Sequence, residues 1–410
     1  MDIRKTNFDY SKISKKIPID EEIINNLSKY KHYYLEWLQD TTGWNFSIYE
    51  RKRYFYEILT YWNSVICDLK PDIYISYTVP HMPAEYALYL LCKHHFKIPT
   101  LFCDITSYFD NSYFVIQGNL ENLSERFIND YKNNDKKVLS NEVKKYLENL
   151  RNKPSEPEAF LKYYNFTQTK KESFLSKILK FTRLILSRNG FKEAEVTFKK
   201  NIKPFKSSQL TNLGLYLFNQ KINKRHQKLL KYYTKNVKVV NKNEKFIYFA
   251  SPYQPEIYSN TSPGPYEDIF LILDTLSSII PDDWKIYYKE HPNIFYKKSN
   301  YTLSRSKEFY DKLKLYKKII LVSHKTSTFE LIDASRAVAT VGGTVGWEAI
   351  IRNKPALVFG NIWYSECQSV FNIRNFNDAE NAISKILQGY VIDMKDVNNY
   401  AQSIYENSFK

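Results

Sequence analysis

The sequence predicts an α/β protein with a mainly parallel sheet in each half. A strand–helix–strand pattern lies within residues 72–104, and strands and helices alternate four times between residues 246 and 360. A short apolar run at 337–341 ends at Gly342 and Gly343, where the backbone can turn sharply. Because a strand, a helix and a second strand usually form a parallel pair, we expect a doubly wound domain in the second half.

Length and composition indicate a globular protein of two domains with anionic partners. The 410 residues are 43% hydrophobic and 25% charged, and the net charge is +16. Such a charge favours nucleic acid, a membrane surface or acidic substrates. No apolar signal segment and no run of about 18 apolar residues occurs, so we expect a cytoplasmic protein. The scattered Cys67, Cys92, Cys103 and Cys367 predict buried thiols, and neither a metal nor a cofactor is expected.

The first half begins with residues 1–70, which have apolar residues at helical spacing. A strand is expected at 72–77, a helix at 84–96 and a second strand at 98–104. Ligands of parallel sheets bind beyond the carboxyl ends of the strands. Residues near these ends are therefore the acid–base candidates of this half.

Those candidates are His81 and Glu85 after the first strand, and Asp104 and Asp110 after the second. Each has a second interpretation. His81 is equally consistent with a solvated loop residue, and Asp104 with a helix cap or turn residue.

The middle of the chain, residues 119–240, has few strand signals and many lysines. Residues 174–188 predict a basic amphipathic helix, which either packs in a core with a solvated lysine face or docks on anionic lipid. A second basic helix at 221–233 is expected to connect the domains.

The second half is expected to bring five loops to one edge of its sheet. Strands are predicted at 246–250, 284–289, 318–322, 337–341 and 355–359, with helices at 266–280, 306–315, 327–333, 378–387 and 394–407. The loops after the strands contain Tyr253, Gln254, Glu256, Glu290, His291, residues 323–327, Gly342, Gly343, Thr344, Trp363 and Tyr364. Lys289, at the end of its strand, could add positive charge to this edge, but it is expected to face solvent.

The turn at 342–344 has two interpretations. It places the amide hydrogens of a helix start behind two glycines, which suits the phosphate of an activated donor. On residue type alone, the pattern favours an ordinary strand-to-helix turn in which Thr344 caps the helix. A histidine and two hydroxyl-bearing loops at the same edge favour a phosphoryl ligand.

Several stretches of the second half, in order, carry a family resemblance. They are Tyr253-Gln254-Pro255-Glu256, Lys289-Glu290-His291-Pro292, residues 327–332, residues 343–349 and Trp363-Tyr364. Together they resemble the bacterial capsule polysaccharide biosynthesis family, whose best-understood members look like Kdo transferases that use CMP-Kdo. The resemblance is dense over residues 246–365. In the first half it rests on Pro80-His81 and the strand ending at Asp104, where Cys103-Asp104-Ile105-Thr106 replaces the family's Glu-x-Gly motif.

The resemblance implies a GT-B fold, in which two Rossmann-like domains face each other across a cleft. Residues 1–235 would form the acceptor domain, including the helical basic segment at about 119–240. Residues 236–390 would bind the nucleotide sugar. The C-terminal helix, within residues 391–410, would pack back on the first domain.

The resemblance also implies site residues. His291 would contact the donor phosphate, and Thr344 with Ser327 or Thr328 would bind the phosphate or cytidine. Glu348 is either a ribose ligand or a helix surface residue. Asp104, with Glu85 as second choice and His81 nearby, would supply the base or nucleophile. The remaining residues expected at the donor are Gln254, Glu256, Glu290, Gly342 and Gly343.

The implied partners are a CMP-sugar donor and a saccharide or lipid-linked acceptor, at the inner face of the cytoplasmic membrane if the basic segment binds anionic lipid. Two alternatives stay open. One is a transferase that uses a sialic acid-like CMP-sugar, a UDP-sugar or a CDP-polyol. The other is a non-enzymatic nucleic-acid-binding protein, which the charge suggests but no motif supports.

Overall fold

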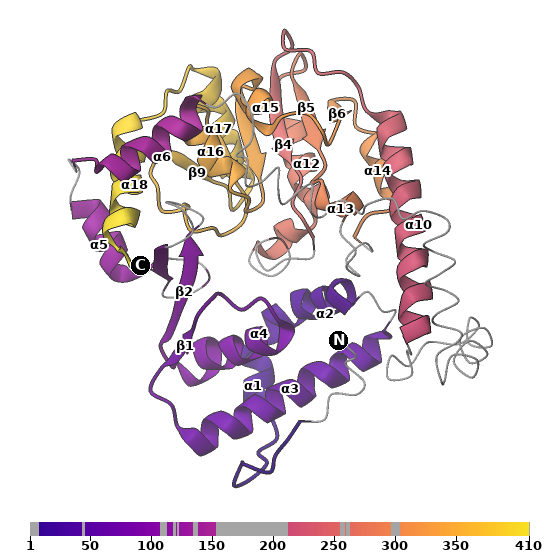
Figure 1. Ribbon diagram of the computed structural model, residues 1–410, viewed down its shortest axis with the longest axis vertical. Coiled ribbons are helices and arrows are strands. Elements are labelled where there is room, and N and C mark those ends of the chain that lie inside the picture. Colours follow the sequence, from indigo (N-terminus) through magenta and orange to yellow (C-terminus); the bar gives the residue numbers. More distant parts are fainter. Residues whose placement is uncertain are drawn as a thin grey trace.

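The computed structural model of the chain has two α/β lobes that face each other (Figure 1). It describes residues 8–42, 46–106, 113–117, 120, 123–133, 138–152, 212–254, 259, 263–296 and 304–409. The expected basic helix at 174–188 lies outside these residues. The α/β class is confirmed, and the facing lobes are the GT-B arrangement that the resemblance implied.

The first lobe combines a small mixed sheet with a helical layer. Strands β1 (Tyr74–Ser76) and β2 (Thr100–Thr106) are parallel, whereas β3 (Tyr113–Gln117) and β10 (Ser408–Phe409) continue the sheet in antiparallel fashion. The predicted strand–helix–strand unit is therefore present, but the expectation of a mainly parallel sheet is wrong for this lobe, because β3 and β10 join it in antiparallel fashion. The helices of this lobe are α1 (Glu21–Asn26), α2 (Ser28–Thr42), α3 (Ile48–Leu69), α4 (Pro83–Leu90) and η1 (Leu91–Phe96).

Helix α3 shows how local sequence sets an element of this lobe. Ser47 and Glu50 form a capping box at its start, with the Ser47 amide donating to Glu50 Oε2 at 2.8 Å. Lys70 ends the helix in the left-handed conformation, at φ 47°. The apolar face of α3, including Phe55, packs on α2 residues such as Trp37, which is 2% exposed.

The second lobe contains a six-stranded parallel sheet in the order β6-β5-β4-β7-β8-β9. This is the 3-2-1-4-5-6 order of a doubly wound dinucleotide-binding fold, with the order reversing between β4 and β7. The strands are β4 (Phe246–Ala250), β5 (Lys285–Lys289), β6 (Ile319–Val322), β7 (Ala337–Thr340), β8 (Ala356–Val358) and β9 (Val370–Asn372). The predicted doubly wound domain is confirmed.

Helices cover both faces of this sheet, so its central strands are buried on both sides. The connections are α10 (Asn212–Asn236), η4 (Gly264–Glu267), α12 (Ile269–Ile279), α13 (Asn293–Tyr296), α14 (Lys307–Leu313), α15 (Thr328–Ala334), α16 (Val345–Ile351) and α17 (Phe376–Leu387).

Helices α5 (Glu125–Asn133), α6 (Asn141–Asn152) and α18 (Met394–Glu406) pack beside this second sheet. Trp347 Nε1 donates to Tyr146 of α6 at 2.9 Å. The expected domain boundary at residue 235 stays a prediction. Even so, α5 and α6 precede it and share a core with the second sheet. The chain end returns to the first lobe, where β10 pairs with β3.

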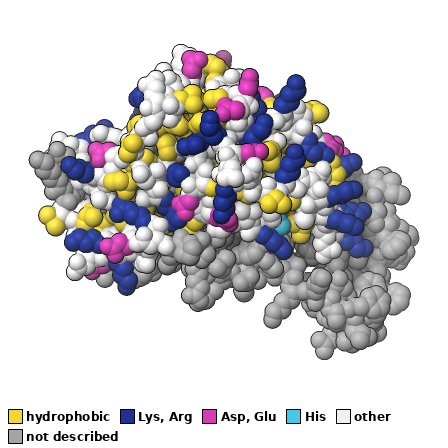
Figure 2. All heavy atoms as spheres, turned by 90° about the horizontal axis from the view of Figure 1, so that it is seen from above, with side chains coloured by type: hydrophobic (Ala, Val, Ile, Leu, Met, Phe, Trp, Pro, Cys, Tyr) yellow, Lys and Arg dark blue, Asp and Glu magenta, His cyan; other side chains and the backbone are white. Residues whose placement is uncertain are grey.

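The surface carries the excess of basic residues that the composition predicts. Figure 2 shows Lys and Arg side chains scattered over the face that it draws, with fewer Asp and Glu among them. None of the described helices combines the length and the hydropathy that a transmembrane span requires.

Candidate functional site

Strands β4 to β8 of the second sheet end level with one another. Ala250 pairs with both Lys289 and Thr340, Lys289 pairs with Val322, and Thr340 pairs with Val358. Adjacent strands lie about 4.8 Å apart, so the ends of β5 and β7 are only about 10 Å from each other. The loops after these strands therefore begin at one edge of the sheet, as the sequence predicted.

Glu290 follows β5 and is fully buried. Its Oε2 accepts hydrogen bonds from Tyr288 at 3.0 Å and Tyr310 at 2.9 Å, and its Oε1 accepts one from Ser251 at 2.7 Å. Arg305 Nε lies 3.0 Å from Oε2 and completes a buried ion pair. Burial and the Glu290 charge raise the pKa values of Tyr288 and Tyr310 well above the usual range, so both phenols remain donors.

Gln254 belongs to the same network. Its Oε1 accepts from Arg305 at 2.9 Å, and its Nε2 donates to the backbone oxygens of Ser259 and Glu267. We expected Gln254 and Glu290 to contact the sugar donor at this edge of the sheet, but they are 5% and 0% exposed. Buried polar groups lose their hydrogen bonds to water and need partners inside the protein. Here Arg305 donates to both Glu290 and Gln254, so the two side chains can be buried.

His291 is held by this network. Its backbone N–H donates to Glu290 Oε1 at 3.2 Å, and its Nδ1 accepts from the backbone N–H of Asn293 at 3.2 Å. The ring lies 5.4 Å from that of Tyr253. Since Nδ1 is an acceptor, the proton of the neutral imidazole is on Nε2. That tautomer suits donation to an anionic oxygen.

Lys289 and Thr328 join the ends of β5 and α15. Lys289 Nζ donates to Thr328 Oγ1 at 2.8 Å. The side chain of Lys289 is only 6% exposed, so the expectation that it faces solvent is wrong. The signal was available: every side chain of a central parallel strand is covered, whichever face it points to. Ser327 caps α15 by accepting from the Glu330 amide at 3.3 Å.

His324 follows β6 and was not singled out from the sequence. It is 4% exposed and lies beside the rings of Tyr233 and Phe295. Burial, with smaller effects from Lys325 and Lys289, lowers its pKa to about 4. His324 is therefore neutral near pH 7.

The turn after β7 differs from the expected cap. Thr344 precedes α16 but has no capping hydrogen bond, because its backbone is already helical, at φ −59° and ψ −19°. Its exposed hydroxyl lies 3.5 Å from Glu348 Oε1. The turn is instead held by Thr340 Oγ1, which accepts from the Gly343 amide at 3.1 Å, and by Tyr364, which donates to the Gly343 carbonyl. Gly342 beside it is half-buried.

The first-lobe candidates are less organised. Glu85 Oε2 accepts from the backbone amides of His81 at 3.1 Å and Met82 at 3.2 Å, which makes it a cap of α4. His81 is exposed. Asp104 was expected at the strand end, but β2 runs on to Thr106 and places Asp104 opposite Val115. Asp110 and Glu256 lie outside the described residues.

Comparison with solved structures found remote likenesses. A Thermosulfurimonas dismutans KpsC beta Kdo 2,7 transferase is 14% identical, with 51% of this chain and 56% of that chain covered and a TM-score of 0.28. The beta Kdo 2,4 transferase of the same KpsC is 11% identical, over 80% and 86%, with a TM-score of 0.29. A UDP-GlcNAc 2-epimerase from Methanocaldococcus jannaschii is 14% identical, over 88% and 82%, with a TM-score of 0.31.

This chain thus spans little more than half the length of the first of these structures. No curated protein matches it in sequence. A family model does match: the model described as capsule polysaccharide biosynthesis protein covers residues 147–367, which is more than half of the chain. That range includes strands β4 to β8 and the candidate site residues in the loops that follow them. The chain belongs to the capsule polysaccharide biosynthesis protein family.

Proposed function

We propose that this protein is a glycosyltransferase of capsular or surface polysaccharide synthesis that takes Kdo or a related acidic sugar from a CMP-activated donor. The family supports the pathway, and the KpsC structures bear the name of Kdo transferases. The observation on which the proposal rests is a histidine that follows β5, the strand beside β4, where the order of the doubly wound sheet reverses between β4 and β7. His291 is fixed there by Glu290 and Asn293, beside the Lys289–Thr328 pair.

The donor phosphate would lie at this edge. His291 Nε2–H would donate to a phosphate oxygen. Lys289, which donates to Thr328 Oγ1, would add electrostatic attraction for the phosphate. Ser327 and the turn residues Gly342, Gly343 and Thr344 would contact the phosphate or the cytidine, with Glu348 near the ribose. In this assignment Glu290 and Gln254 orient His291 and do not touch the donor.

Transfer would occur between the lobes. As the C–O bond between the anomeric carbon and the phosphate breaks, negative charge develops on CMP, and His291 would stabilise it. The first lobe would bind the saccharide or lipid-linked acceptor and supply the base or nucleophile. Asp104 is the first candidate because Glu85 already caps α4 and His81 is exposed. The net charge of +16 would favour an anionic membrane surface, where lipid-linked acceptors reside.

A donor panel tests the proposal. The purified protein is incubated with CMP-Kdo, a CMP-sialic acid, a UDP-sugar and a CDP-polyol, and the released nucleotide is measured. We expect release of CMP from an acidic CMP-sugar, and none from a folded His291→Ala variant. Release of UDP or CDP would show that the donor is the UDP-sugar or the CDP-polyol and not a CMP-sugar. A salt-dependent shift of oligonucleotides with no release from any donor would replace the function with nucleic-acid binding.

A further inference from the structure

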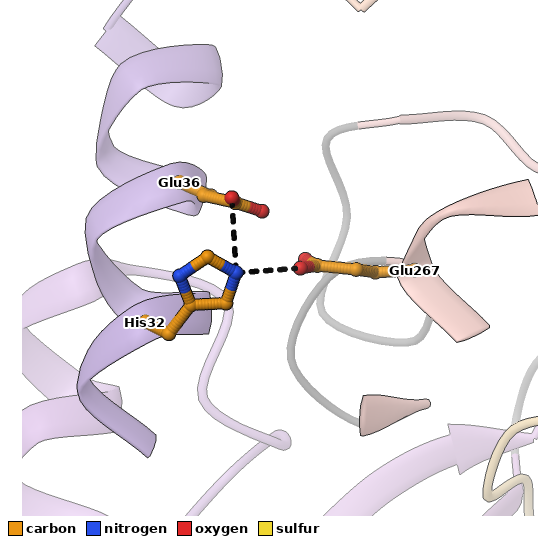
Figure 3. Close-up of side chains that lie close together, drawn as sticks. All are labelled: His32, Glu36 and Glu267. Atoms are coloured by element: carbon orange, nitrogen blue, oxygen red, sulfur yellow. Dashed lines mark ion pairs between the residues drawn. The ribbon is translucent and has the colours of Figure 1, made fainter. Parts of the chain in front are cut away.

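Helix α2 of the first lobe meets the η4 turn of the second lobe through a histidine and two glutamates. His32 Nε2 lies 3.1 Å from Glu36 Oε1 and 3.9 Å from Glu267 Oε1 (Figure 3). The Tyr33 side chain of α2 also reaches η4 here, since its hydroxyl would lie 3.8 Å from a Cβ on Gly264. The cluster therefore lies at a contact between the lobes.

The geometry of the cluster suits a small divalent ion. His32 and Glu36 are four residues apart and so share one face of α2. The three ligand atoms all lie within 4.8 Å of one another. Ligand bonds of about 2.0–2.1 Å to tetrahedral Zn²⁺ place neighbouring ligand atoms about 3.4 Å apart. The observed 3.1 and 3.9 Å lie on either side of that separation.

Charge and exposure agree with this geometry. Two carboxylates balance the charge of a divalent ion, and an imidazole nitrogen is a ligand that Zn²⁺ favours. The His32 side chain is 70% exposed, so water can reach the fourth position.

Glu267 is well anchored on the second lobe. Its side chain is 9% exposed, and its backbone oxygen accepts from Gln254 Nε2 at 2.8 Å. Gln254 in turn contacts Arg305, which pairs with Glu290 behind His291. A link between α2 and Glu267 therefore leads by direct contacts to the support of His291.

We propose that His32, Glu36 and Glu267 bind one divalent ion of the Zn²⁺ type, which fastens the first lobe to the second. The ion is structural: two ligands come from α2 and one from η4, so it binds fully only when the lobes are together. The site would exist whatever donor the protein uses, and its test does not depend on transferase activity.

Zinc titration of the full chain, stripped of metal and followed by calorimetry, tests the site. We expect one equivalent of Zn²⁺ to bind. Because Glu267→Gln keeps the shape of the side chain but removes a charged ligand, affinity should fall at least about tenfold. His32→Ala should have a similar effect. His81→Ala removes another exposed histidine of the first lobe and should leave Zn²⁺ affinity unchanged.

Two further measurements separate the possible outcomes. Co²⁺ in place of Zn²⁺ should give visible bands of a tetrahedral site without the thiolate charge-transfer band that binding at a cysteine would produce. Zn²⁺ should slow hydrogen exchange in the η4 segment of the wild type but not of His32→Ala. Thermal unfolding without metal establishes that each variant is folded. Glu36→Gln, at a ligand more exposed than Glu267, replaces Glu267→Gln if that variant does not fold. Absent binding, or equal affinity in wild type and Glu267→Gln, would overturn the proposal.

Discussion

The second lobe contains a buried ion pair, whereas the ion pairs within the described part of the first lobe are exposed. In the second lobe, Glu290 and Arg305 are 0% and 2% exposed, and hydroxyl and amide partners surround them. In the first lobe, the Arg53–Glu57 pair of α3 is 65% and 36% exposed. Charges are buried only where hydrogen bonds compensate for lost hydration, so a buried network marks a rigid, preorganised region. The difference places the organised half of the candidate site in the second lobe.

Breaking the buried pair should produce the largest loss of stability. Arg305→Met removes the positive partner but keeps much of the volume, and so leaves Glu290 buried without its counter-charge. We expect a loss of about 3–5 kcal/mol in the free energy of unfolding, measured by urea denaturation.

The exposed pair is the matched control. Glu57→Gln breaks an i,i+4 contact in water and should cost at most about 0.5 kcal/mol. Equal losses in the two variants would remove the distinction between the lobes. A fully folded Arg305→Met protein that also keeps its donor turnover would show that the network does not orient His291.

The dependence of stability on pH tests the burial of His324 near the candidate site. His324 has a folded-state pKa of about 4, below its ordinary value of 6.5. The unfolded chain therefore binds more protons between pH 6.5 and 4, and stability falls as pH falls through that window. His324 alone would account for up to about 3 kcal/mol. His324→Phe keeps a ring beside Tyr233 and Phe295 and should flatten this part of the profile. An unchanged profile would contradict the assignment.

A smaller effect is expected at Gly346 in the first turn of α16. A Cβ on Gly346 would overlap the Tyr364 hydroxyl and lie 3.0 Å from Tyr364 Cζ. Because Tyr364 is buried and bonded to the Gly343 carbonyl, it cannot move freely. Gly346→Ala should lower stability by about 1–3 kcal/mol, measured by thermal unfolding. Adding Tyr364→Phe removes the overlapped oxygen and should restore part of the loss; no recovery would show that the clash lies elsewhere.

The sequence predicted the second lobe well because its signals are local. Short apolar runs, the glycines at 342–343 and the stretch that ends in His291 are enough to place successive strands and the loops that follow them. Parallel pairing then brings those loops to one edge without any knowledge of side-chain contacts.

The partners of those loops could not be predicted in the same way. Arg305 lies 15 residues beyond Glu290, in a stretch with no motif, yet its ion pair compensates for the burial of the Glu290 charge. Lys289 was assigned to solvent by its charge, although its strand is covered on both faces. Thr344 has the residue type of a cap but not the backbone conformation of one. Each error concerns a tertiary contact or a dihedral angle that composition does not encode.

A comparison of CMP affinity between two histidine variants tests the central claim most directly. CMP is titrated calorimetrically into wild type, His291→Ala and His81→Ala, each shown to be folded. A hydrogen bond to a charged phosphate is worth about 1.5–3 kcal/mol, so His291→Ala should bind CMP on the order of 10- to 150-fold more weakly. His81→Ala should bind it as wild type does. Unchanged affinity in His291→Ala, or its loss only in His81→Ala, would contradict a nucleotide site at the edge of the second sheet.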